Sequence, residues 1–152
     1  MKHLNELSTV RLNTSSGQFY YQLAIDGEIL ENILDRNYPG QNLLGLVPTL
    51  LNWLENKDER KCVWERIIPN ENEKVLSPIL MCNDDLDLWC AVIVAESTCF
   101  GAEIIWNRIG VSRGFDDATE REEVNWLDKL GPYIFDKKEF LSCVDLFKRE
   151  LD

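Results

Sequence analysis

The sequence is short of histidine, the residue on which many catalytic and metal-binding motifs depend. The only histidine among 152 residues is His3, close to the start of the chain. A histidine-activated nucleophile or a histidine-ligated metal ion would depend on a terminal segment, where chains are often poorly ordered. The glycine-rich signatures G-x-G-x-x-G and G-x-x-x-x-G-K-[ST] of nucleotide-binding proteins are also absent. No motif therefore indicates an enzyme or a bound cofactor.

Positive charge is scarce as well. The chain has 16 lysines and arginines against 27 aspartates and glutamates, which gives a formal net charge of -11 and a pI near 4.5. Such a field repels the phosphate backbone, and no local basic patch offsets it, so we expect no nucleic-acid partner. A negative surface speeds encounter with a cationic protein, so neutral or basic protein partners are favoured. The charge is also compatible with a purely solubilising role.

Long apolar runs are missing too. No apolar run reaches the roughly 18 residues of a membrane-spanning helix, and "MKHLNELSTVRLN" lacks the apolar core of a signal peptide. We therefore expect a cytoplasmic protein with no membrane partner. The length is typical of one domain, so residues 1–152 are predicted to fold as a single unit.

The cysteines are odd in number and contain no C-x-x-C pair. This pattern favours scattered, reduced and mostly buried thiols over a disulfide framework or a zinc site. The five positions are Cys62, Cys82, Cys90, Cys99 and Cys143.

The first part of the chain predicts a hairpin followed by a helix. The strand-like stretches 18–24 and 28–34 flank Asp26-Gly27, a strong turn signal. Farther on, apolar residues at helical spacing predict a helix from about 48 to 56, with a proline at its first position. The leucines that would face the core are Leu50, Leu51 and Leu54.

From residue 60 onward the pattern changes to short strands joined by polar turns, which predicts an antiparallel sheet. The four strand-like segments span residues 61–68, 74–81, 88–97 and 102–111. Pro78, within the second segment, argues for an edge position or a bulge.

The end of the chain predicts a helix over residues 137–150. Asp136 is suited to the N-cap, and Glu139 stands three residues later, as in a capping box. The apolar stripe of this helix consists of Phe140, Val144, Phe147 and Leu151. The predicted fold class is α+β, with a mostly antiparallel sheet of five or six strands packed against two main helices, about 48–56 and 137–150.

The segment "LMCNDDLDLWC", residues 80–90, concentrates three carboxylates between two cysteines. Asn83, Asp85 and Asp87 match the first, third and fifth positions of an EF-hand loop. Leu88 replaces the glycine that the sixth position requires, and Val94 replaces the glutamate at the twelfth. The calcium motif therefore fails, and a turn leading into a central strand is the favoured interpretation, with a looser divalent-metal site as the alternative.

Glu96 falls at the margin of the predicted sheet, where a salt bridge to Arg108 is the preferred interpretation.

The five tryptophans divide into core and interface candidates. Those in or beside predicted strands are expected in the core. Trp126 differs, because it lies beside the acidic residues of the stretch 112–128 and is expected at an interface. The tryptophans expected in the core are Trp64, Trp89 and Trp106.

The segment "ILMCNDDLDLWCAVIVAE", followed by "IIWNRIG", resembles a family of small bacterial immunity proteins from polymorphic and contact-dependent growth inhibition toxin systems. Members carry a Cys-x-Asp-Asp-Leu-Asp segment, an apolar strand ending near a glutamate, and a Trp-x-Arg-x-Gly strand. The matching residues here are Cys82, Asp84, Asp85, Leu86, Asp87, Glu96, Trp106, Arg108 and Gly110. Asn83 departs from the proline that is frequent at its position, and the resemblance covers about residues 17–111.

The resemblance implies a non-enzymatic inhibitor that binds one cognate toxin domain, often a nuclease. Nucleases carry positive charge to hold phosphate, so an acidic inhibitor can be steered to that surface and block it. The expected partner-binding residues are Asp116, Asp117, Glu120, Glu122, Glu123 and Trp126, followed by Asp84, Asp85 and Asp87. The alternatives are a divalent-metal-dependent hydrolase using the 84–87 carboxylates and a non-catalytic adaptor subunit. The sequence leaves the oligomeric state open.

Overall fold

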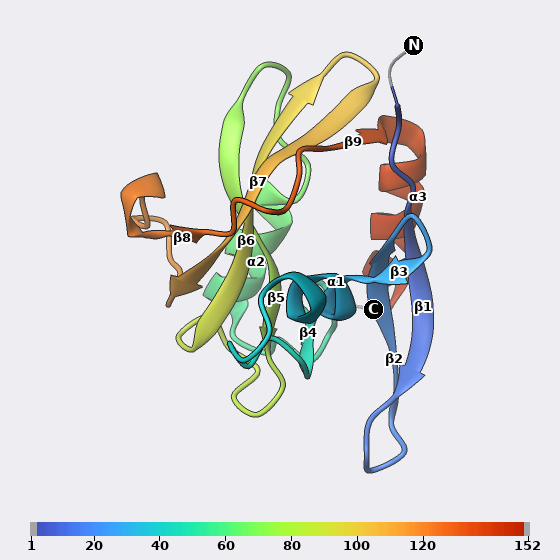
Figure 1. The fold of residues 1–152 in the computed structure, drawn as a ribbon, viewed down its shortest axis with the longest axis vertical. Helices are drawn as coiled ribbons and strands as arrows, with labels where there is room; N and C mark the ends of the chain where they lie inside the picture. Colours follow the sequence, from blue (N-terminus) through green and yellow to red (C-terminus); the bar gives the residue numbers. More distant parts are fainter. Residues whose placement is uncertain (1–2, 151–152) are drawn as a thin grey trace.

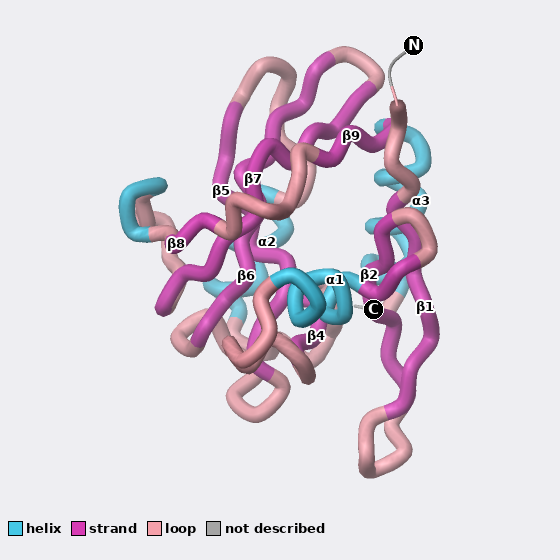
Figure 2. The backbone as a smooth tube through the Cα atoms, viewed as in Figure 1, coloured by secondary structure: helices cyan, strands magenta, loops and turns pink. Residues whose placement is uncertain are grey.

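The computed structural model describes residues 3–150, which form two antiparallel sheets and three helices (Figures 1 and 2). The strands are β1 (Leu7–Asn13), β2 (Phe19–Ile25), β3 (Glu28–Ile29), β4 (Leu46–Pro48), β5 (Lys74–Cys82), β6 (Ala91–Phe100), β7 (Glu103–Arg113), β8 (Asn125–Trp126) and β9 (Tyr133–Asp136). The helices are α1 (Leu30–Asn37), α2 (Lys57–Arg66) and α3 (Lys137–Arg149), with a 3-10 turn, η1, at Arg121–Glu123.

The larger sheet has the order β4-β5-β6-β7-β8, and β9 also pairs with β7. The smaller sheet has the order β1-β2-β3, and α3 packs between the sheets against β1, β7 and β9 (Figure 1). All of these strand pairs are antiparallel, so the predicted α+β class with a mostly antiparallel sheet is confirmed. Within residues 3–150, no helix combines the length and the apolar character needed to cross a membrane.

The hydrophobic core extends through β6 and reaches α3 through Trp106 of β7. β6 is buried on both faces from Val92 to Ser97, because elements cover both sides of the sheet. The fully buried Trp106 of β7 packs edge-on against Phe135 of β9 and Phe140 of α3, with ring centroids 4.9 and 6.0 Å apart. These contacts join the C-terminal helix to the middle of the larger sheet, and Trp106 lies in the core as predicted.

Several predicted elements are confirmed. β5, β6 and β7 lie close to the expected ranges, and Pro78 coincides with a shift of register between Pro78 and Leu80, as expected of a bulge. β5 is not an edge strand, since β4 covers its other side. The Asp136 carboxylate accepts a hydrogen bond from the Glu139 amide at 3.2 Å and starts α3. The stripe residues Phe140, Val144 and Phe147 are buried, while Leu151 lies outside the described residues.

The predicted helix at 48–56 is wrong. Instead, residues 46–48 form β4, because the Thr49 amide donates to the Ile79 carbonyl at 3.0 Å and its hydroxyl donates to the Pro78 carbonyl at 2.8 Å. These bonds keep the chain paired with β5. The leucines of this stretch are buried as predicted, but turns rather than a helix carry them.

The chain instead forms helix α2 at Lys57–Arg66, which overlaps the strand predicted over 61–68. The Asn56 side chain accepts a hydrogen bond from the Glu59 amide at 3.0 Å and caps α2. Val63 and Ile67, four residues apart, are both buried on the helix face toward the core. A segment this short can show strand-like alternation by chance and still form a helix. Trp64, which was expected in the core, is only half-buried.

The predicted hairpin is right at its turn and wrong in its second half. Asp26 and Gly27 form the turn with positive φ angles of 53° and 85°. Only β3 follows as strand, and the chain then enters α1, whose Leu30, Ile33 and Leu34 are buried at helical spacing. Over most of its length β2 pairs with β1 instead.

Gly110 is required for the contact between β7 and β8. A side-chain carbon at this position would collide with Val124, and it would lie 2.9 Å from the Asn125 carbonyl and 3.0 Å from a ring carbon of Trp126. A glycine therefore lets the chain after η1 lie directly on β7.

We expect Gly110→Ala to lower the free energy of unfolding by about 1–3 kcal/mol, because the added methyl group overpacks this contact. Urea denaturation of the variant beside wild type measures the change. Arg113→Ala, an exposed position at the end of the same strand, serves as the control and should have little effect. Equal stabilities of Gly110→Ala and wild type would contradict the close packing.

Candidate functional site

The structure brings the two acidic segments predicted from the sequence to one edge of the larger sheet. Ala91 pairs with Arg113, so the segment before β6 and the segment after β7 leave the sheet at the same end. There the Gly114 amide donates to the Cys90 carbonyl at 3.0 Å, and the Phe115 amide donates to the Leu88 carbonyl at 2.7 Å. These bonds hold the 84–87 turn beside the 116–123 segment.

Trp89 lies between these segments with 70% of its surface exposed. Its neighbours in the chain and across the turn, Leu88 and Phe115, are buried. Two shallow hollows of about 290 and 210 Å³ flank it. The prediction that Trp89 packs in the core is wrong, because Leu88 takes the inward position and turns its neighbour outward. We call Trp89 and the residues lining these two hollows the Trp89 surface.

Carboxylates surround this exposed ring. Asp58 and Glu59 come from the first turn of α2, Asp116 and Asp117 from the segment after β7, and Glu123 from η1. Three of these five, Asp116, Asp117 and Glu123, were predicted as partner-binding residues. Arg113 is the one basic residue that lines these hollows, so the exposed ring stands within a rim of net negative charge, a composition typical of an interaction site for a basic partner.

Some rim carboxylates also hold the backbone. The Glu59 carboxylate accepts a hydrogen bond from the Leu88 amide at 3.1 Å, and burial raises the pKa of Glu59. The Asp87 carboxylate accepts from the Trp89 amide at 3.0 Å. Asp117 pairs with Arg66 at 2.8 Å but remains 83% exposed. The backbone that carries the tryptophan is therefore fixed from α2 and from its own turn.

The remaining predicted residues lie elsewhere. Glu120 and Glu122 line a neighbouring hollow with Arg66, Lys74 and Arg121. Asp84 and Asp85 are exposed in the turn between β5 and β6.

Trp126 was expected at an interface beside these acids but does not belong to the Trp89 surface. It pairs with Gly110 on β8, and the Arg108 guanidinium stacks 4.0 Å from its ring centre, which leaves Trp126 half-buried. Trp89, Asp58 and Glu59 were missed by sequence reasoning. The criterion applied to Trp126, an aromatic residue beside acidic ones, also fits Trp89 in "DDLDLW" and would have found it.

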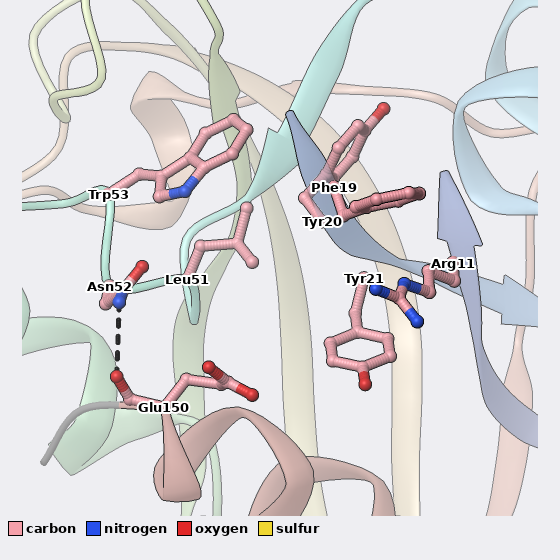
Figure 3. Close-up of a pocket in the computed structure, with 8 residues that line it drawn as sticks. All are labelled: Arg11, Phe19, Tyr20, Tyr21, Leu51, Asn52, Trp53 and Glu150. Atoms are coloured by element: carbon pink, nitrogen blue, oxygen red, sulfur yellow. Dashed lines mark hydrogen bonds between the residues drawn. The ribbon is translucent and has the colours of Figure 1, made fainter. Parts of the chain in front are cut away.

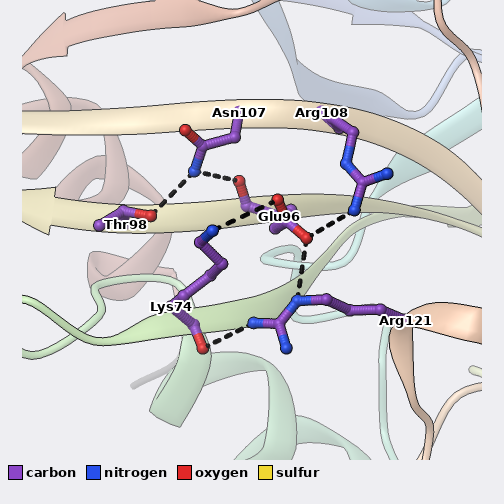
Figure 4. Close-up of polar contacts among 6 residues, drawn as sticks. All are labelled: Lys74, Glu96, Thr98, Asn107, Arg108 and Arg121. Atoms are coloured by element: carbon purple, nitrogen blue, oxygen red, sulfur yellow. Dashed lines mark hydrogen bonds and ion pairs between the residues drawn. The ribbon is translucent and has the colours of Figure 1, made fainter.

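A buried carboxylate anchors the acidic segment to the sheet (Figure 4). The Glu96 side chain is 5% exposed and lies 2.9 Å from Arg108, 2.9 Å from Arg121 and 4.0 Å from Lys74. Arg121 also donates to the Lys74 carbonyl at 3.1 Å. The predicted pair of Glu96 with Arg108 is confirmed, and Arg121 extends it to η1. One carboxylate thus connects β5, β6, β7 and η1.

Electrostatics keep this carboxylate charged. Burial alone would raise the pKa of Glu96, but the hydrogen bond from Arg108 and the charges of Arg108, Lys74 and Arg121 outweigh burial and hold the pKa below its ordinary value. An ionised carboxylate that is already shared among three cations is poorly suited to general acid or base catalysis. Its role is to position η1.

Another hollow, of about 220 Å³, lies near the β1–β2 hairpin (Figure 3). Tyr20 packs against Trp53 with ring centroids 5.4 Å apart, and Arg11 stacks 4.2 Å from the centre of the Phe19 ring. Its eight lining residues include no cysteine, histidine or serine. Half of the residues that line this hollow are aromatic, so it lies mainly between packed rings.

No protein-family model, no curated protein and no solved structure matches this chain. The geometry of the described residues is therefore the basis for any functional proposal.

We expect Glu96→Gln to destabilise the protein at pH 7 by about 2 kcal/mol, the scale of a hydrogen bond to a charged group. Because folding lowers the pKa of Glu96, its stabilisation is present above the unfolded value near 4.5 and is lost as pH falls through the folded value. Urea denaturation between pH 3 and pH 7 should show the two proteins converging in acid. Glu65→Gln, at an exposed pair with Lys61, is the control and should be nearly neutral. A constant difference at every pH would contradict this assignment.

Proposed function

We propose that this protein is a cytoplasmic immunity protein that binds a cognate, basic toxin domain through the Trp89 surface and covers the toxin's active or substrate-binding surface. The observation that carries the proposal is Trp89 itself, a 70% exposed indole within an acidic rim. Tryptophan is among the residues that most often dominate binding energy at protein interfaces.

The rigid support of this ring favours tight binding. The amides of Leu88 and Trp89 are hydrogen-bonded to carboxylates, and the Phe115 amide is bonded to the Leu88 carbonyl. A backbone held in its binding conformation before the partner arrives loses less conformational entropy on binding. The segment that carries the ring is therefore already ordered for binding.

Charge supports the same function. The net charge of -11 and the acidic rim favour rapid association with a positively charged surface. A nuclease must present such a surface to hold phosphate. An acidic protein that occupies it competes directly with nucleic acid, so inhibition requires no catalytic group on the inhibitor. The likeness of residues 17–111 to immunity proteins supports the same conclusion.

We expect Trp89→Ala to weaken binding to a toxin domain encoded beside its gene by about 30-fold or more, equivalent to about 2 kcal/mol. Surface plasmon resonance measures the affinity. Phe100→Ala is the matched control. Phe100 is 60% exposed and is the last residue of β6, whereas Trp89 lies just before the first residue of that strand. Equal losses in both variants, or none in Trp89→Ala, would place the interface elsewhere.

Charge reversal tests the steering separately. We expect Asp117→Lys combined with Glu122→Lys to slow association about tenfold and flatten its salt dependence, because exposed charges act mainly on the on-rate. Stopped-flow kinetics at low and high salt measure both effects. The double variant Asp145→Lys, Glu150→Lys on the α3 side changes the net charge equally. Identical kinetics of the two double variants would show that only total charge matters.

A further inference from the structure

Two thiols and a carboxylate converge at the turn between β5 and β6. The antiparallel pairing of these strands places Cys82, at the end of β5, beside Cys90, just before β6, and their sulfur atoms lie 2.7 Å apart. One oxygen of Asp85, near the tip of the same turn, completes the group, and all three donor atoms lie within 4.8 Å of one another. Within residues 3–150 this is the one such set of histidine, cysteine, aspartate or glutamate donors.

The donor types select the class of ion. Two sulfurs with one oxygen suit Zn²⁺ and similar thiophilic ions, whereas Ca²⁺ and Mg²⁺ prefer oxygen donors throughout. Two sulfurs bound tetrahedrally at about 2.3 Å from zinc stand about 3.8 Å apart, so binding requires the thiols to separate by about 1 Å. Both side chains are only partly buried, which leaves room for that adjustment.

The turn is held in place independently of these donors. The Leu86 amide donates to the Cys82 carbonyl at 3.0 Å, and the Gly114 amide donates to the Cys90 carbonyl at 3.0 Å. Glu59 holds the Leu88 amide from α2. Because these bonds already order the backbone of the turn, binding of an ion costs less conformational entropy.

We propose that Cys82, Cys90 and Asp85 form a site for one Zn²⁺ ion, with a fourth position left for water or a partner's side chain. Binding replaces the two thiol protons, which pass to solvent, with two sulfur–zinc bonds, and no oxidation state changes. In the metal-free protein, burial and the neighbouring Cys90 thiol keep the pKa of Cys82 high, at about 12, so this sulfur carries its proton at pH 7. Because Trp89 adjoins Cys90, a bound ion would further fix the backbone of the Trp89 surface.

Calorimetric titration of phosphine-reduced, metal-free protein with zinc chloride tests the site. We expect binding of about one ion per chain, and with Co²⁺ the thiolate-to-cobalt absorption in the near ultraviolet. Cys82→Ser and Cys90→Ser should each weaken binding by about 100-fold or more, and Asp85→Asn by about tenfold. Absence of zinc binding to the reduced protein, or of the cobalt band, would overturn the proposal.

Matched variants separate this site from unspecific binding. Asp84→Asn removes the adjacent exposed carboxylate, and Cys143→Ser removes a buried thiol of α3, so both should retain wild-type affinity. Equal losses in Asp84→Asn and Asp85→Asn, or in Cys143→Ser and Cys82→Ser, would contradict the assignment.

A fluorescence measurement locates the ion without relying on cysteine variants that fold poorly. Co²⁺ bound at the site should quench Trp89, the tryptophan next to Cys90 in the chain. Trp89→Phe should keep its calorimetric affinity for Zn²⁺ but lose most of the cobalt quenching. Undiminished quenching in Trp89→Phe would place the ion near another tryptophan and overturn the proposal.

Discussion

The buried carboxylate of Glu96 is the interaction on which the arrangement of the candidate site depends. A carboxylate with 5% exposure is costly to bury unless cations compensate it, and here Arg108, Arg121 and Lys74 do so from separate elements. If one cation is removed, the Glu96 carboxylate is still paired with the other two. If Glu96 is removed, the three cations lie beside one another with no negative charge between them. The centre therefore fixes where η1 stands on the sheet, and with it Glu123 at the rim of the Trp89 surface.

The distribution of charge separates the structural part of the molecule from its candidate interface. With only 16 basic residues in the chain, several of them are used internally: two arginines at Glu96, and Arg66 beside Phe115 and Asp117. Around Trp89, by contrast, Asp58, Asp116 and Glu123 have no basic partner among the ion pairs of the described residues. Arg113 also lines this surface, but the carboxylates outnumber it, so a partner's arginines or lysines would meet a net negative rim.

Local signals in the sequence predicted the elements that local interactions determine. The Asp136 cap and apolar stripe predicted α3, and alternation or apolar runs predicted β5, β6 and β7. The helix expected at 48–56 failed because Thr49 pairs with β5, a contact distant in sequence. For the site, acidic composition identified Asp116, Asp117 and Glu123, but their proximity to Trp89 depends on the β6–β7 register, which composition does not encode.

Three of the residues that resemble the immunity-protein motif have structural roles in the β6–β7 hairpin. Trp106 fills the core, Arg108 connects Glu96 to Trp126, and Gly110 admits β8. All three lie within the β6–β7 hairpin, whereas the Trp89 surface is built from the open end of that hairpin, the segments that leave it, and α2 with the residue that caps it. Under the proposed function, substitutions among the exposed residues of the Trp89 surface would change the partner while the hairpin and its buried ion cluster stay unchanged. The hairpin thus carries the packing of the fold, while the proposed binding site lies beyond its end, so each can be changed without the other.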